Sequence, residues 1–295
     1  MSEPARKPLL AIIGGSGVYN IPGLKRTGEE AVESPFGEPS DQLFFGELDG
    51  QPLVFLPRHG RRHTIPPTDI NFRANIDALK RVGVTEILSM SAVGSLREDL
   101  APGSLVIVDE FVDRTIARSR TFFDAGIVAH VSMADPVCRR LGDHIEAAAA
   151  EVGVDVVRGG TYLVIEGPQF SSRAESALFR SWGMDVIGMT NLPEAKLARE
   201  AEICYATVAM VADFDCWHPH HLDVTVEEIM GVVMANAEKA RTLIQAVAPR
   251  LRDRDGPCEA GCHRALDDAI VTDREARDPD SVKRLAAVAG RVLGS

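Results

Sequence analysis

The chain has 295 residues, and its 45% hydrophobic content is enough for a substantial buried core within one domain. A formal net charge of -11 argues against general binding of nucleic acids or anionic membranes, because such binding depends on a surplus of Lys and Arg. The apolar runs are shorter than a membrane span requires, and the N-terminus lacks the long apolar segment of a secretory signal, so we expect a cytoplasmic protein.

Short runs rich in Val, Ile and Leu recur along the chain and predict β-strands. Helical patterns lie between them, and the dipeptide Asp49-Gly50 predicts a hairpin turn. The order of elements indicates an α/β fold, with a single domain built on a central mixed, twisted β-sheet flanked by helices. We predict strands in LLAIIGG, LFFGELDGQPLVFLPRHG, EILSMSAVGSL, SLVIVDEFV, TYLVIEGP, MDVIGMT and ICYATVAMVADFD, and helices near 68–82, 135–152, 172–182, 193–202 and 225–248.

The last part of the chain differs in composition from the rest. After about residue 250 the sequence becomes highly charged, and two short helical patterns lie in HRALDDAIV and DSVKRLAAVAGRVL. We therefore expect a main domain over residues 8–250, which carries the function, and a helical C-terminal extension over residues 251–295.

The cysteine content does not indicate a disulfide framework. Cys138 and Cys204 lie in apolar segments, where reduced, buried thiols are the ordinary finding. Cys258 and Cys262 could pair across their short loop, but a reducing cytosol opposes this. The segments CWHPHH and CEAGCH could suggest a metal site, yet their spacings match no compact zinc pattern. We therefore expect polar surface loops there and no metal.

A glycine-rich turn, AIIGGSGVYN, follows the first predicted strand. Asn20 stands where the third glycine of a dinucleotide-binding pattern belongs, which weakens that interpretation. The backbone N–H groups of such a loop, together with the Ser16 hydroxyl, can still bind an anion. A plain tight turn is the alternative.

Basic residues are concentrated in LPRHGRRHTIPP, directly after a predicted strand. The Arg58 guanidinium suits phosphate oxygens, and the His59 imidazole can add a hydrogen bond. Neighbouring side chains on an extended strand point in opposite directions, so these two could share a ligand only if the backbone turns there. The alternative is a solvated basic loop.

Three other strand ends carry residues suited to a ligand. In SMSAVGSL, Ser91 and Ala92 are small enough for a ligand to approach the backbone, although they could instead allow a helix to pack closely. Phe170 could stack on a flat ring or belong to the core, and Ser171 follows it near a predicted helix start. In GMTNLPEAKLARE, apolar Met189 and the Thr190 hydroxyl precede another helix, though a lone Met more often serves packing.

Two carboxylates end the most apolar predicted strand, in VADFDCW. Residues two apart on an extended strand point to the same face, so Asp213 and Asp215 should converge on one spot. We expect a group with hydrogen-bond donors to bind there.

Five of these segments together resemble one family. They resemble, in the same order along the chain, the 5'-methylthioadenosine phosphorylases of the purine nucleoside phosphorylase superfamily. The five segments are IIGGSGVY, PRHGRRHTIPP, SAVGSLRED, IEGPQFSSRAES and GMTNLPEAKLAREAEICYATVAMVADFDCW. The resemblance covers about residues 8–248. It implies a nucleoside phosphorylase-like fold and a homotrimer. The implied reaction is phosphorolysis of 5'-methylthioadenosine to adenine and 5-methylthioribose 1-phosphate, in methylthioadenosine recycling and purine salvage. Inorganic phosphate is then a co-substrate, and no metal or organic cofactor is expected.

The resemblance also implies roles for individual residues. Phosphate binding is assigned to Ser16, Arg58, His59, Ser91, Ala92 and Thr190. Nucleoside binding is assigned to Phe170, Ser171, Met189, Asp213, Asp215, His130, Val226 and Ile229. His130 would reach the 5' pocket of a neighbouring subunit, and Val226 and Ile229 would line that pocket.

The two aspartates suit the chemistry of this reaction independently of the resemblance. Breaking the N9–C1' bond leaves negative charge on the purine, so a proton donor near N7 lowers the barrier. Two carboxyls in one apolar pocket resist double ionisation, which raises one pKa. We take Asp213 as the donor to N7 and Asp215 as the partner of the 6-amino group, although either could serve. An acid pair favours aminopurines over 6-oxopurines, whose oxygen an ionised aspartate would repel.

Three alternatives remain. A phosphorylase of 6-oxopurine nucleosides or of 5'-methylthioinosine is disfavoured by Asp213 and Asp215. A hydrolase of the same nucleoside is disfavoured by the phosphate set around Arg58. A non-catalytic nucleoside-binding protein would bind the ligand without turnover in phosphate.

Overall fold

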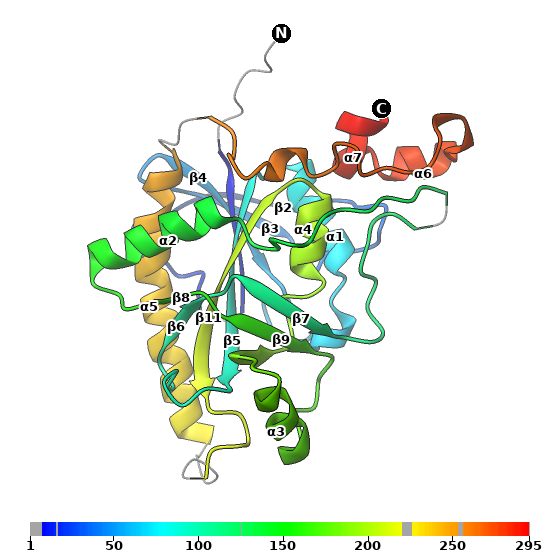
Figure 1. Cartoon of the computed structure of the whole chain (residues 1–295). Coiled ribbons are helices and arrows are strands. Elements are labelled where there is room, and N and C mark those ends of the chain that lie inside the picture. Colours follow the sequence, from blue (N-terminus) through cyan, green and yellow to red (C-terminus); the bar gives the residue numbers. More distant parts are fainter. Residues whose placement is uncertain (1–7, 16, 125, 220–225, 253–255, 295) are drawn as a thin grey trace.

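The computed structural model describes residues 8–15, 17–124, 126–219, 226–252 and 256–294 (Figure 1). The strands are β1 (Leu10–Gly14), β2 (Lys25–Glu30), β3 (Leu43–Leu48), β4 (Gln51–Pro57), β5 (Glu86–Ser95), β6 (Leu105–Ile107), β7 (Glu110–Arg114), β8 (Val157–Arg158), β9 (Thr161–Ile165), β10 (Val186–Gly188) and β11 (Cys204–Asp213). The α-helices are α1 (Phe72–Arg81), α2 (Arg139–Val152), α3 (Arg173–Ser181), α4 (Glu194–Glu200), α5 (Val226–Arg252), α6 (Pro279–Arg284) and α7 (Ala286–Leu293).

All of these strands belong to one mixed sheet, as the sequence predicted. Its main path runs β2-β3-β4-β1-β5-β10-β9-β7, and β11 pairs with both β5 and β6. The central part of the sheet, β4-β1-β5-β11, is parallel, because each of these strands runs in the same direction as its neighbours. In contrast, β10 is antiparallel to β5. The predicted hairpin is confirmed, because Asp49 and Gly50 join β3 to β4 with φ values of 49° and 80°.

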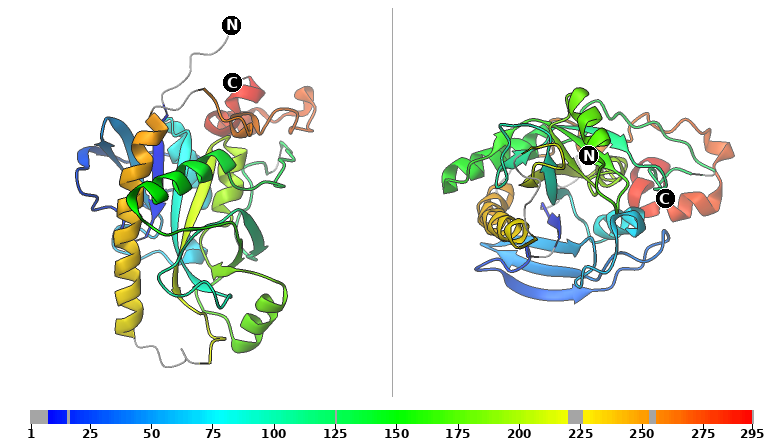
Figure 2. Two further views of the ribbon diagram at one scale, coloured as in Figure 1. Left: turned by 60° about the vertical axis from the view of Figure 1, so that its left-hand side comes forward. Right: turned by 90° about the horizontal axis from the view of Figure 1, so that it is seen from below.

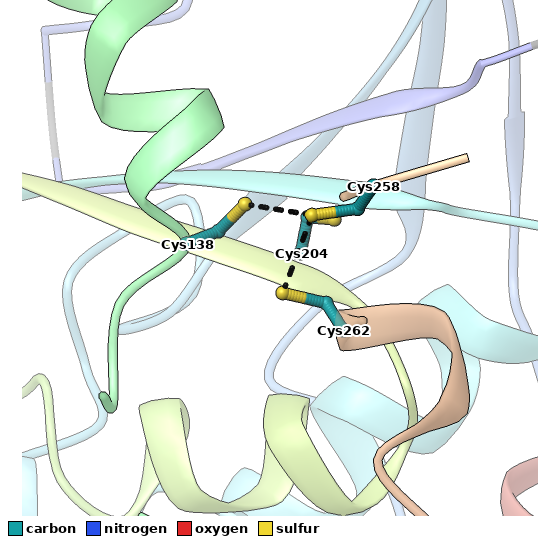
Figure 3. Close-up of side chains that lie close together, drawn as sticks. All are labelled: Cys138, Cys204, Cys258 and Cys262. Carbon is teal, nitrogen blue, oxygen red and sulfur yellow. Dashed lines mark hydrogen bonds between the residues drawn. The ribbon is translucent and has the colours of Figure 1, made fainter. Parts of the chain in front are cut away.

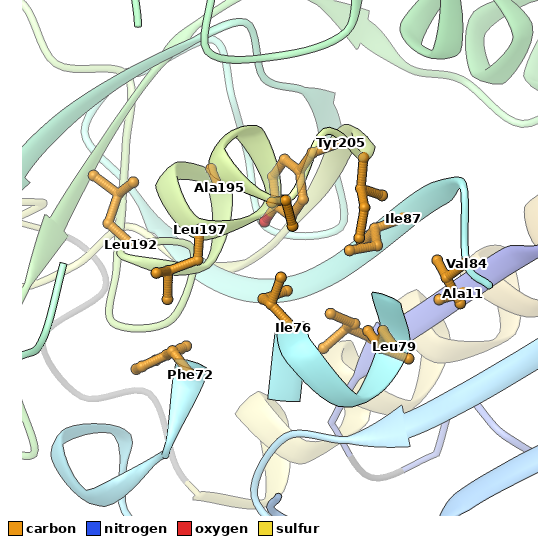
Figure 4. Close-up of a cluster of buried hydrophobic side chains, with 14 of the residues drawn as sticks. Ala11, Phe72, Ile76, Leu79, Val84, Ile87, Leu192, Ala195, Leu197 and Tyr205 are labelled. Atoms are coloured by element: carbon orange, nitrogen blue, oxygen red, sulfur yellow. The ribbon is translucent and has the colours of Figure 1, made fainter. Parts of the chain in front are cut away.

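Helices cover both faces of the sheet (Figures 1 and 2). In β1, Leu10 and Ile12 face a core shared with α2 and α5, whereas Ala11 and Ile13 face a core shared with α1, α4 and α7. This alternation follows from the two-residue period of a strand, and burial of both faces explains why β1 and β11 are apolar at almost every position. Figure 4 shows the core shared with α1, α4 and α7, in which side chains of α1 and α4 pack near Ile87 of β5.

Local signals set the helix boundaries close to the predicted ones. The Asn71 side chain caps α1, and Ser172 forms a capping box with Glu175 at the start of α3. Helix α2 begins at Arg139, after the predicted position of 135, because the backbone is still extended at Cys138, which is the N-cap residue. Among the described residues, no helix is long and apolar enough to cross a membrane.

The C-terminal segment packs on the same core as the rest of the chain. Leu266 and Val288 join the core that contains α1 and α4, and Arg291 pairs with Glu202. The predicted helix in HRALDDAIV is wrong, because only the short 3-10 helix Cys262–Arg264 forms there and turns follow. The second predicted helix forms as α6 and α7, with a break at Leu285.

Candidate active site

The carboxyl ends of β1, β4, β5 and β11 lie at one edge of the sheet, because these neighbouring strands are parallel. In open α/β sheets, ligands bind beyond this edge. Gly14 pairs with Pro57, and Asp213 pairs with Gly94, so the segments that follow these strands come together. They are the segments that the sequence singled out.

The glycine-rich loop after β1 borders an open space. Gly17 has a φ of 101°, which favours glycine, and a Cβ added at Gly15 would meet no atom within 4 Å. A cavity of about 320 Å³ adjoins the loop, with Tyr19 and His59 among the residues that line it. Among the described residues assigned to phosphate, His59 lines this cavity, whereas Arg58, Ser91 and the two aspartates do not. Ser16 lies outside the described residues.

Arg58 is buried, with 2% of its surface exposed, so the alternative of a solvated basic loop is wrong for this residue. Its Nε and Nη2 donate to the two carboxylate oxygens of Glu194 at 3.1 and 3.0 Å, a bidentate ion pair. Nη2 also donates to Ser89 Oγ at 2.6 Å, and Nη1 donates to the Met90 carbonyl at 2.8 Å. Within the described part of the chain, one Nη1 N–H is therefore left for a ligand.

His59 lies beside Arg58 because β4 ends at Pro57 and the backbone turns there. Its Nδ1 is 2.9 Å from the Ile65 carbonyl oxygen. A carbonyl can only accept, so Nδ1 carries a hydrogen and Nε2 of the neutral ring is an acceptor. Burial lowers the pKa of His59 to about 4, so the ring is neutral at pH 7.

Two hydroxyls that the family resemblance assigned to phosphate meet in the structure. Ser91 Oγ, on β5, lies 2.9 Å from Thr190 Oγ1, which follows β10. The same oxygen lies 3.0 Å from Tyr162 Oη, a buried phenol on β9 whose pKa is raised by that burial. Both Ser91 and Thr190 are largely buried, whereas Ala92 is exposed next to them. Strands distant in the sequence thus bring these groups to one place.

A buried polar network behind Arg58 was not predicted from the sequence. Tyr205 Oη donates to Glu194 Oε1 at 2.9 Å, and Asn191 Nδ2 donates to Tyr205 Oη at 2.7 Å and to Ser89 Oγ at 3.0 Å. Glu194 resembles an ordinary acidic residue in the first turn of a helix, and only the fold shows that it faces Arg58. A buried carboxylate at the start of α4 therefore holds the arginine in place.

Arg118, which no sequence pattern indicated, joins two loops of the site. Its Nε donates to Glu166 Oε1 at 3.0 Å, and its Nη1 donates to the Met189 carbonyl at 2.6 Å. A Cβ added at Gly167 would lie 2.4 Å from Met189 Sδ, so the loop after β9 packs directly on this methionine. The arginine thereby fixes the loop that leads to Phe170 relative to Met189.

Asp213 and Asp215 lie together, but not for the reason that the sequence suggested. Strand β11 ends at Asp213, and Asp215 has a φ of 51°, so the extended period of two residues does not reach it. Instead, Asp213 Oδ1 accepts a hydrogen bond from the Asp215 backbone N–H at 2.8 Å. A Cβ at Gly94 would lie 2.9 Å from Asp213 Oδ1 and 3.3 Å from Asp215 Cβ, so only glycine leaves room for both.

Burial raises the pKa of both aspartates. The negative charge of Asp215 raises the pKa of Asp213 further. A carboxyl whose pKa is raised in this way can hold a proton closer to neutral pH, as a general acid must. The direction of both pKa shifts agrees with the sequence argument, and the role of either aspartate as proton donor stays a prediction.

Not all of the other residues predicted to bind the nucleoside lie close to Asp213 and Asp215. Ser171 lies near Asp215, since its carbonyl is 3.3 Å from the Sγ of Cys216. Phe170 is 83% exposed, which excludes the core alternative. His130 is also exposed, and its backbone N–H donates to the Ala269 carbonyl in the C-terminal segment. Val226 and Ile229 lie in the first turn of α5, but their side chains are outside the described residues.

With this geometry in place, comparison with known proteins identifies the class of protein. The sequence profile of the Phosphorylase superfamily matches residues 9–249, so the chain belongs to this superfamily. This confirms the superfamily to which the sequence motifs pointed.

Its relatives are more specific. An S-methyl-5'-thioadenosine phosphorylase of Rhodospirillum rubrum is 60% identical over 294 residues, which is 100% of each chain. One of Bradyrhizobium diazoefficiens is 57% identical and covers 97% of this chain and 98% of its own. Among solved structures, a methylthioadenosine phosphorylase from an Antarctic soil metagenomic library has a TM-score of 0.90 and 45% identity, covering 96% of this chain and 99% of its own. A methylthioadenosine phosphorylase of Schistosoma mansoni in complex with adenine has a TM-score of 0.83 and 34% identity, covering 92% and 99%. The predicted fold class is confirmed by these structures.

Proposed function

We propose that the protein catalyses the phosphorolysis of 5'-methylthioadenosine to adenine and 5-methylthioribose 1-phosphate. The observation that carries the proposal is the pair Asp213 and Asp215, with raised pKa values, at the sheet edge where Ser91 meets Thr190. Two relatives at least 57% identical over nearly their whole length are named for this activity. The protein is then a pentosyltransferase of purine and methionine salvage.

The reaction balances without an oxidant or a metal. A phosphate oxygen forms a bond to C1' as the C1'–N9 bond breaks, and the electron pair of that bond passes to the purine. Protonation at N7 makes neutral adenine the leaving group, and an anion under the ribose stabilises the positive charge that develops on the sugar. We therefore expect nucleoside and inorganic phosphate to be the only small molecules required.

The phosphate site in this proposal lies between the loop after β1 and the segment after β10. Arg58 offers its remaining Nη1 N–H, while Ser91 and Thr190 offer hydroxyls. With Nδ1 hydrogen-bonded to the Ile65 carbonyl, His59 Nε2 can accept a hydrogen bond from the O–H group of a monoprotonated phosphate. The Ala92 backbone and Ser16 complete the set.

The nucleoside lies next to this site, toward α3. Asp213 protonates N7, and Asp215 accepts a hydrogen bond from the 6-amino group. Met189, which Arg118 and the loop at Gly167 hold in place, packs against the ribose. Phe170 and Ser171 contact the base.

Oligomerisation would complete the site. Phe170 and His130 are exposed on this chain, as expected of residues that cover or enter a site at a subunit boundary. We propose a homotrimer in which His130 of one subunit reaches the 5' pocket of the next, with Val226 and Ile229 lining that pocket. We also propose a cytoplasmic location, a catalytic domain over residues 8–250 and a helical C-terminal extension over residues 251–295.

The test is phosphate-dependent release of free base from 5'-methylthioadenosine. It is run beside 5'-methylthioinosine, inosine and a control without phosphate. We expect adenine release only when phosphate is present. A preference for the 6-oxopurines would contradict the role of the aspartates, and release without phosphate would identify a hydrolase.

A further inference from the structure

Four of the five cysteines meet in the structure, although they come from three separate parts of the chain (Figure 3). Cys138 is the N-cap residue of α2, Cys204 is the first residue of β11, and Cys258 and Cys262 follow α5. All four are buried and free of disulfide bonds. Their sulfur atoms lie within 4.8 Å of one another.

The spacing of these sulfurs fits tetrahedral coordination of one metal ion. A Zn–S bond is about 2.3 Å, which places two sulfurs of a tetrahedral site about 3.8 Å apart. In the structure, Cys258 Sγ lies 3.5 Å from Cys138 Sγ and 3.7 Å from Cys262 Sγ. Disulfide-bonded sulfurs are about 2.05 Å apart, so neither pair is close to that geometry.

Two arginines place positive charge against the sulfurs. Arg140 Nη2 lies 3.5 Å from Cys204 Sγ, and Arg199 Nη1 lies 3.5 Å from Cys262 Sγ. A divalent ion with four thiolates carries a net charge of about -2, and Arg199 offsets part of it while both guanidinium groups can donate N–H groups to the sulfurs. Arg140 also pairs with buried Glu86, which keeps its guanidinium oriented.

We propose that Cys138, Cys204, Cys258 and Cys262 bind one Zn²⁺ ion in a tetrathiolate site. Binding releases four thiol protons and needs no oxidant, whereas two disulfides would require one. Four protein ligands leave no open position for substrate or water, so the ion is structural. The sequence predicted no metal because the spacings in CWHPHH and CEAGCH match no compact zinc pattern. We revise that expectation because the fold, not the spacing, brings the four cysteines together.

The position of the site indicates its role. Cys204 begins β11 and Asp213 ends it, so the two sites are separated by the length of the strand, about 30 Å. Cys138 and Cys204 belong to the main domain, whereas Cys258 and Cys262 belong to the C-terminal segment. The ion therefore links that segment to α2 and β11.

The experiment measures metal in the full-length protein, purified under reducing conditions from zinc-supplemented cells and dialysed. Elemental analysis should find about one zinc per chain. Cys262→Ser and Cys138→Ser should reduce this to a small fraction, whereas Cys216→Ser, which alters the cysteine outside the cluster, should retain it. Co²⁺ exchanged into the wild-type protein should show the thiolate charge-transfer and d–d absorption of a tetrahedral site.

Two results would overturn the proposal. One is wild-type protein without bound zinc or cobalt in which all five thiols react as free thiols after unfolding. The other is non-reducing mass spectrometry that finds disulfides among the four cysteines and no metal. Both results are obtained on wild-type protein, so a misfolded variant cannot obscure them.

Discussion

Replacement of Arg58 by Ala would test both the fold and the phosphate site. The structure shows that Arg58 and Glu194 form an ion pair in which each side chain is only 2% exposed. Removing one partner of a buried pair costs about 3–5 kcal/mol, because the other charge stays buried without compensation. Since a domain has roughly 5–15 kcal/mol of stability, Arg58→Ala should lose a large part of it. Urea denaturation at fixed protein concentration measures this loss.

A second variant separates stability from phosphate binding. Arg58→Met combined with Glu194→Gln removes both charges and keeps an acceptor for Tyr205, so it should recover most of the lost stability. It cannot recover a hydrogen bond from a guanidinium to phosphate, which is worth about 1.5–3 kcal/mol. The KM for phosphate should therefore stay raised by roughly 10- to 100-fold.

The outcome can refute each part of this reasoning. Unchanged stability of Arg58→Ala would mean that the ion pair with Glu194 does not form in solution. A wild-type phosphate KM in the double variant would mean that Arg58 only supports the fold. If nucleoside binding alone weakened, the phosphate assignment would be wrong.

Three further predictions follow from named side chains. Asp213→Asn and Asp215→Asn should lower kcat/KM for 5'-methylthioadenosine by about 10²- to 10⁴-fold, and full activity of both would remove the account of base recognition. Burial raises the pKa of Glu200 to about 7, so the folded state binds a proton more tightly than the unfolded state, and stability should fall as pH rises from about 4.5 to above 7. In urea titrations at several pH values, Glu200→Gln should make the free energy of unfolding depend less on pH. The same pH dependence as in the wild type would contradict the role of Glu200. His130→Ala should raise the nucleoside KM by roughly tenfold, and an equal rise in the phosphate KM would argue against a 5' pocket role.

Local patterns in the sequence were sufficient for much of the fold. The buried strands β1 and β11 are apolar over most of their length, and helices α1 and α3 begin at capping residues. Strand β2 could not be predicted, because its six residues, KRTGEE, are all exposed and show no apolar alternation. It exists because its backbone pairs with β3 at the edge of the sheet.

Part of the candidate site, like part of the fold, could be predicted from local sequence patterns. Glycine-rich, basic and acidic residues at strand ends were visible in the sequence because ligand chemistry demands particular residue types in short segments. The sequence also determined the class of protein, through five motifs in a fixed order. It could not show that Glu194 would hold Arg58, since such a contact depends on where α4 packs.

Long-range proximity was decided only by the tertiary structure. Asp213 and Asp215 were correctly paired from the sequence, but a turn with positive φ at Asp215, and not strand geometry, brings them together. Cys138 and Cys258 are 120 residues apart, and their sulfurs meet because α2 and the segment after α5 pack at the start of β11. Local periodicity reports which face of an element is buried, whereas the contacts between faces arise from packing the whole chain.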